Sequence, residues 1–120
     1  MDQEPMSDNK RSGALGAMDT RSSPADKIVR AHIWVKGRVQ GVGFRAYVEY
    51  SARQIGGLTG WVRNVGYDTV EAVAEGERSN VERLIQVIKD GPRGSRVDES
   101  KIEWEEPTGE SDRFDMRRSM

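Results

Sequence analysis

Two short stretches of this sequence contain residues suited to chemistry on an anion. GRVQGVGFR (37–45) places three glycines and two arginines in nine residues, and GWVRN (60–64) ends on an asparagine. Glycine allows close approach of the backbone and unusual φ angles. The guanidinium of an arginine can hold two phosphate oxygens at once, which a lysine cannot do. The first stretch therefore predicts an anion site, and Arg45 favours a phosphate.

The glycine-rich loop joins a predicted strand to a predicted helix. The strand, 28–36, alternates apolar and polar residues, and the helix, 43–55, spaces its apolar residues three and four apart. The loop amides and the unpaired N–H groups of the first helical turn would point into one hollow, where the helix dipole favours an anion. Tight packing is the other explanation for such a loop. The sequence matches neither the P-loop nor the dinucleotide-binding pattern.

The remaining elements predict an α+β fold. Ser79 with Glu82 forms a capping-box pattern that would open a second helix, and Gly91-Pro92 would end it. Three further strands are predicted at 58–64, 69–76 and 97–104, with a hairpin at 65–68 and a short edge strand in RFDMR (113–117). The order is βαββαβ, which predicts a ferredoxin-like α/β sandwich, an antiparallel sheet with both helices on one face.

Composition narrows the function classes. The chain has 120 residues, no cysteine, one histidine and a net charge of −1. Disulfide frameworks, thiolate zinc sites and histidine-cluster metal sites are therefore excluded, and no basic field would recruit nucleic acid or a membrane. Residues 1–26 are too polar to pack, so we expect a disordered tail followed by one domain over 27–118. We expect a cytoplasmic monomer.

The two stretches, nineteen residues apart from Arg45 to Asn64, resemble the signatures of the acylphosphatase family, G-x-V-Q-G-V-x-F-R and G-W-V-x-N. The resemblance spans roughly 31–117. It implies the ferredoxin-like fold and hydrolysis of acyl phosphates to carboxylate and inorganic phosphate, without metal or cofactor. Arg45 matches the family's phosphate-binding catalytic arginine, and Asn64 the asparagine that orients the attacking water. The phosphate cradle is matched by the backbone of Arg38, Val39, Gln40, Gly41, Val42 and Gly43.

The chemistry of such a reaction suits these residues. An acyl phosphate already has a good leaving group, so a protein need only hold the phosphoryl group and place a water in line. An asparagine amide can accept from a water and donate to it but has no basicity. By hypothesis, a phosphate oxygen of the substrate takes the proton. Asn64 lies near the loop only if the two central strands, 28–36 and 69–76, are neighbours.

Two departures from the family pattern concern the position of Asn64. Gly56-Gly57 carries one glycine more than the usual spacing, and we expect the extra residue to bulge in the connection without shifting the strand register. Asp68 stands where the family has glycine, which leaves the hairpin shape open, although Gly66 can supply the flexible residue.

Alternatives remain for the site residues and for the function. Asn64 alone also fits a turn-forming residue, Arg38 fits a solvated loop arginine, and Gln40 can hydrogen-bond within the loop and hold its shape. An RNA-binding module on the same fold would need stacking aromatics on its central strands, and the strand 69–76 offers none. A non-catalytic anion-binding domain is the third reading.

Overall fold

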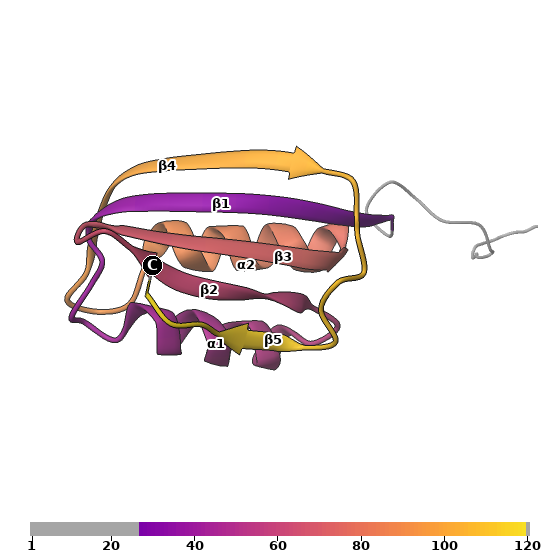
Figure 1. Ribbon diagram of the computed structural model, residues 1–120, viewed down its shortest axis with the longest axis horizontal. Coiled ribbons are helices and arrows are strands. Elements are labelled where there is room, and N and C mark those ends of the chain that lie inside the picture. Colours follow the sequence, from indigo (N-terminus) through magenta and orange to yellow (C-terminus); the bar gives the residue numbers. More distant parts are fainter. Residues whose placement is uncertain (1–26, 120) are drawn as a thin grey trace, which may run out of the picture.

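The computed structural model describes residues 27–119, so the tail predicted over 1–26 lies outside the described residues. The elements follow the order β1 (Ile28–Arg38), α1 (Phe44–Ile55), β2 (Thr59–Val65), β3 (Thr69–Glu77), α2 (Arg78–Asp90), β4 (Arg96–Glu105) and β5 (Phe114–Met116). Both helices lie on one face of a single sheet (Figure 1). The predicted ferredoxin-like α/β sandwich is confirmed.

The sheet has the strand order β4-β1-β3-β2-β5. β1 pairs antiparallel with both β3 and β4, and β2 pairs antiparallel with β3. The two central strands are therefore neighbours, as the predicted position of Asn64 requires. The short edge strand is also present, but β5 runs parallel to β2, because the chain crosses from the β4 edge to the opposite edge through residues 106–113 (Figure 1).

The core lies between the sheet and the two helices. Alternation along β1 places every second side chain on the helix side, and the helices contribute residues three and four apart. The side chains so buried include Ala31, Ile33 and Val35 of β1, Phe44, Val48 and Ala52 of α1, and Val81, Leu84 and Ile88 of α2. Neither helix among residues 27–119 is long and apolar enough to cross a membrane.

The start of α2 differs from the prediction. The helix begins at Arg78, so Ser79 lies inside it and the predicted capping box is wrong. The Arg78 amide donates to the Lys27 carbonyl (2.9 Å), and the Arg78 side chain donates to the Glu82 carboxylate (3.0 Å). Glu82 is thus engaged by Arg78. The predicted end is confirmed, because Gly91 caps the helix through its amide.

The extra glycine between α1 and β2 is taken up in the connection, as expected. Gly56 and Gly57 both have positive φ angles, 83° and 69°. β2 then pairs with β3 in unbroken register, with Asn64 opposite Val70. In the hairpin, Gly66 has a φ of 62° and supplies the left-handed residue that the turn needs.

The face of the sheet opposite the helices carries a buried ion pair that fastens the β4–β5 connection (106–113). The Glu75 carboxylate accepts from Arg30 Nη1 (2.6 Å), from the amide and hydroxyl of Thr108 (2.9 and 3.0 Å) and from the Gly109 amide (3.0 Å). Burial alone would raise the pKa of Glu75, but these hydrogen bonds outweigh it and lower the pKa to about 2. The folded chain therefore depends on an ionised Glu75.

Replacing Glu75 with glutamine tests this dependence. Because the pKa is depressed on folding, the carboxylate stabilises the fold above its ordinary value of 4.5, and the stabilisation is lost as pH falls towards about 2. The depression corresponds to roughly 3 kcal/mol. In urea unfolding we expect Glu75→Gln to be less stable than the unaltered chain at neutral pH, with a gap that closes in acid.

Glu103→Gln is the matched control, because Glu103 is exposed on the same face and pairs only with Lys101 in the described chain (3.2 Å). The free energy of unfolding of this variant should differ little from that of the unaltered chain at any pH. A Glu75→Gln gap that stayed constant from neutral pH to about pH 2 would contradict the account.

Candidate functional site

The glycine-rich loop, between β1 and α1, owes two of its glycines to backbone conformation. Gly41 and Gly43 have φ angles of 76° and 75°, in the left-handed region, and Gly43 is the N-cap of α1. A Cβ at either position would meet no atom of the described residues within 4 Å. At Gly37, in contrast, a Cβ would lie 2.3 Å from the Arg96 carbonyl oxygen. Close packing therefore explains Gly37 but not the two glycines beside the helix.

The loop, the first turn of α1 and the end of β2 enclose a hollow of about 280 Å³. It brings Arg45 and Asn64 together, although the two lie on different elements of the fold. The hollow is lined by Val39, Gln40, Gly41, Gly43, Phe44, Arg45, Ala46, Asn64 and Met116.

Arg45 lies in the first turn of α1 and is half-buried. Its Nη1 donates to the carbonyl oxygen of Arg117, just beyond β5, at 3.0 Å. A guanidinium has several N–H donors in a fixed plane, so one bond to β5 orients the group and leaves donors for an anion in the hollow.

Asn64 lies near the end of β2. Its side chain is on the same face of the strand as the fully buried Val62, two residues earlier, which is the face covered by α1. β3 lies between β2 and β1 in the sheet. β2 ends at the same end of the sheet at which the loop leaves β1, so Asn64 and the loop line one hollow.

Gln40 turns its side chain towards the hairpin. Its Nε2 lies 2.9 Å from the Thr69 carbonyl oxygen, 3.2 Å from that of Gly66 and 3.4 Å from that of Val65. The expectation of a bond within the loop is therefore wrong: the amide joins the loop to a neighbouring element. Gln40 still lines the hollow with the rest of its surface.

The other residues of the predicted cradle divide into two groups. Val39, Gly41 and Gly43 line the hollow, whereas Arg38 is exposed and does not line it, and Val42 packs against the core. The structure thus favours a solvated Arg38.

Met116 was missed by the sequence analysis, although it lines the hollow and is 44% exposed. RFDMR signalled an edge strand, but nothing in it signals pairing with β2. That pairing is what brings Met116 and the Arg117 carbonyl beside α1.

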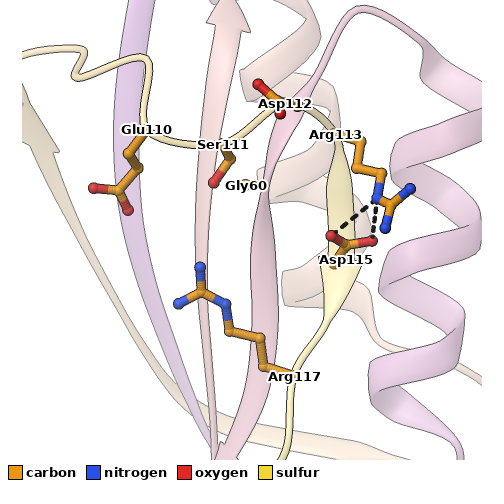
Figure 2. Close-up of a pocket in the computed structure, with 7 residues that line it drawn as sticks. All are labelled: Gly60, Glu110, Ser111, Asp112, Arg113, Asp115 and Arg117. Carbon is orange, nitrogen blue, oxygen red and sulfur yellow. Dashed lines mark hydrogen bonds and ion pairs between the residues drawn. The ribbon is translucent and has the colours of Figure 1, made fainter.

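A second hollow, of about 440 Å³, lies beside β5 and receives the Arg117 side chain (Figure 2). Its lining includes the carboxylates of Glu110, Asp112 and Asp115, and Arg113 pairs with Asp115 at 3.1 Å. Three carboxylates disfavour a phosphate, so the smaller hollow, which they do not line, is the better anion site. Within residues 27–119, no three His, Cys, Asp or Glu side chains are arranged to hold a metal ion.

Two further polar side chains, those of Arg63 and His32, lie on the face of the sheet opposite the helices. Arg63 and His32 both contact the Glu71 carboxylate, at 2.8 and 2.5 Å. Burial would raise the pKa of Glu71, but the hydrogen bonds from His32 and Arg63 outweigh it and lower the pKa. Both side chains are therefore engaged in an ion-pair cluster on the face of the sheet away from the hollow.

Comparisons with known proteins point to one family. A family model described as acylphosphatase matches residues 31–116. An acylphosphatase of Roseiflexus sp. (strain RS-1) is 46% identical over 89 residues, covering 74% of this chain and 95% of that protein. One from Thermococcus kodakarensis is 51% identical over 83 residues, covering 69% and 90%. The crystal structure of acylphosphatase from Bacillus subtilis matches with a TM-score of 0.70 at 32% identity, covering 74% of this chain and 98% of that one.

Substitutions at Gly43 test whether the left-handed backbone, and not lack of space, is the reason for a glycine at this position. Gly43→Ala should lower the free energy of unfolding by about 1 to 2 kcal/mol, because its φ is left-handed, and Gly43→Asn should cost less, because asparagine tolerates this region. Urea unfolding measures both. Gly60→Ala, where a Cβ would lie 1.9 Å from the Val73 carbonyl oxygen, should cost more. Equal losses for Gly43→Ala and Gly60→Ala would indicate crowding at both positions.

Proposed function

The chain belongs to the acylphosphatase family and hydrolyses acyl phosphates to carboxylate and inorganic phosphate, and we propose that Arg45 and the loop 38–43 hold the phosphoryl group while Asn64 orients the attacking water. One observation carries this assignment: Arg45 and Asn64 line the same hollow at the start of α1.

The phosphoryl group would be held by backbone and by one side chain. The amides of the loop and of the first turn of α1 are suited to phosphate oxygens, and the helix dipole adds partial positive charge at this end. Arg45 supplies the full positive charge, oriented by its bond to the Arg117 carbonyl (3.0 Å). Charge that spreads over the equatorial oxygens in the transition state then meets donors already in place.

The water would be placed by Asn64. Its amide oxygen accepts a hydrogen bond from the water, and its NH₂ can donate to the water or to a phosphate oxygen. As the bond from the water oxygen to phosphorus forms, the bond from phosphorus to the acyl oxygen breaks and the carboxylate leaves with the electron pair. The water's proton passes to a phosphate oxygen, so no strong general base is needed.

This scheme supports a metal-independent enzyme, because Arg45 supplies the positive charge and the leaving group is already good. We also propose that the protein is a cytoplasmic monomer and binds no nucleic acid, which fits its net charge of −1. The RNA-binding alternative finds no support in the comparisons. On the face of the sheet opposite the helices, Val73 of the central strand β3 is aliphatic and only 1% exposed, so it offers no surface on which a base could stack.

Alanine substitutions separate the two roles. With benzoyl phosphate as substrate, we expect Arg45→Ala and Asn64→Ala each to lower kcat by about 10² to 10³-fold, because each removes a preorganised contact to the transition state. Inorganic phosphate, used as a competitive inhibitor, should bind much more weakly to Arg45→Ala and almost normally to Asn64→Ala.

Arg83→Ala, on the exposed side of α2, is the control for loss of an arginine and should keep the parent rate. Near-parent rates in both site variants, with the fold verified by circular dichroism, would rule out the assignment.

Metal independence is tested with the unaltered protein. Dialysis against excess EDTA, followed by assay in the chelator, should leave the rate of benzoyl phosphate hydrolysis unchanged. A loss that Mg²⁺ or Zn²⁺ restores would show that a metal takes part.

A further inference from the structure

Gln40 is the side-chain link between the phosphate loop and the strand end that carries Asn64. Its Nε2 faces three carbonyl oxygens of the hairpin, those of Val65, Gly66 and Thr69. The contact with Thr69 is the shortest of the three at 2.9 Å, and the carbonyls of Gly66 and Val65 lie at 3.2 and 3.4 Å, so three acceptors surround the two hydrogens of the amide NH₂.

The acceptors lie on both strands of the hairpin. Val65 and Thr69 are the pair that closes it, the last residue of β2 and the first of β3. Val65 directly follows Asn64, so its carbonyl is in the next peptide unit along the chain. Gln40 therefore holds the backbone beside Asn64 from the loop itself.

A backbone bond reaches the same hairpin from the end of β1, where the Gly37 amide donates to the Asp68 carbonyl at 2.9 Å. Gly37 lies three residues before Gln40, and the two glycines that follow in the loop, Gly41 and Gly43, have left-handed φ angles. Backbone pairing therefore fixes the hairpin to β1 but does not extend to the part of the loop that lines the hollow. The Gln40 side chain joins that part to the hairpin.

We propose that Gln40 is a positioning residue that sets the distance between the phosphate cradle and the water held by Asn64. Its amide acts on the reaction through Asn64 and does not hold the phosphate. The inference rests on the proposed role of Asn64. A displacement of about 1 Å in a reacting group can cost about 10²-fold in rate, so losing this link should be visible in kcat.

The test is a double-mutant cycle with Gln40→Met, which keeps the length of the side chain and removes the donors. Four proteins are compared, the parent, Gln40→Met, Asn64→Ala and the double variant, for kcat with benzoyl phosphate and for inhibition by inorganic phosphate. We expect Gln40→Met to lower kcat by about 10- to 100-fold and to change the phosphate inhibition constant by less than about twofold. In the Asn64→Ala background it should have almost no further effect on kcat.

Gln54→Met, on the exposed side of α1, is the matched control and should keep the parent kcat. If Gln40→Met does not fold, Gln40→Asn enters the same cycle, because it keeps the amide and withdraws it by one methylene. It should then show the same coupling to Asn64→Ala.

The outcomes separate this inference from the proposed function. If Asn64→Ala itself keeps the parent rate, the proposed role of Asn64 fails and the inference fails with it. If Asn64→Ala is impaired while Gln40→Met lowers kcat by the same factor with and without it, Gln40 acts on the cradle, and only the inference is overturned. The same conclusion follows if Gln40→Met weakens phosphate binding in proportion to its loss of kcat. An unchanged kcat in Gln40→Met also overturns it.

Discussion

The position of β3 between β1 and β2 is the constraint on which the site depends. Neighbouring strands lie about 5 Å apart, so the ends of β1 and β2 are separated by roughly 10 Å of sheet. The glycine-rich loop follows β1, and Asn64 lies near the end of β2. The hollow of about 280 Å³ that the loop and Asn64 both line could hold a phosphoryl group and a water together. The loop has to leave the sheet and turn into α1 within a few residues, and Gly41 and Gly43 provide that turn through left-handed backbone.

The far edge of the sheet contributes to the same site. Glu75 binds the β4–β5 connection (106–113) on the face of the sheet opposite the helices. That connection leads the chain to β5, at the edge of the sheet beside β2. β5 in turn presents the Arg117 carbonyl to Arg45. A buried carboxylate on one face of the sheet is thus linked, through a crossing segment, to the orientation of a guanidinium at the site. Removing one partner of such a buried pair is costly because the other charge loses its compensation.

The parts of the fold that follow from local pattern could be predicted from the sequence. The alternation of β1 and the helical spacing of α1 and α2 gave the elements to within a few residues, and their order gave the ferredoxin-like topology. The intact alternation in GWVRN was enough to place Asn64 on the correct face despite the extra glycine. Arg45 and Asn64 were singled out from the motifs and are brought together by the structure.

The remaining features depend on contacts distant in sequence, and local pattern does not contain them. The capping box failed because the helix begins at Arg78, one residue before Ser79, where the Arg78 amide donates to the Lys27 carbonyl on a segment far away in the chain. The contacts of Gln40 with the hairpin join residues that are 25 to 29 positions apart in the sequence. The contact of Arg45 with Arg117 joins residues that are 72 positions apart. The parallel pairing of β5 with β2, which brings Met116 to the hollow, is of the same kind.

A crystal structure with inorganic phosphate bound would show directly whether the hollow between the loop and Asn64 holds the phosphoryl group. We expect phosphate oxygens within hydrogen-bonding distance of the amides of residues 40–43 and of the Arg45 guanidinium, with a water between the phosphate and the Asn64 amide. Phosphate bound instead beside Arg113 and Arg117, with the loop empty, would contradict the proposed site.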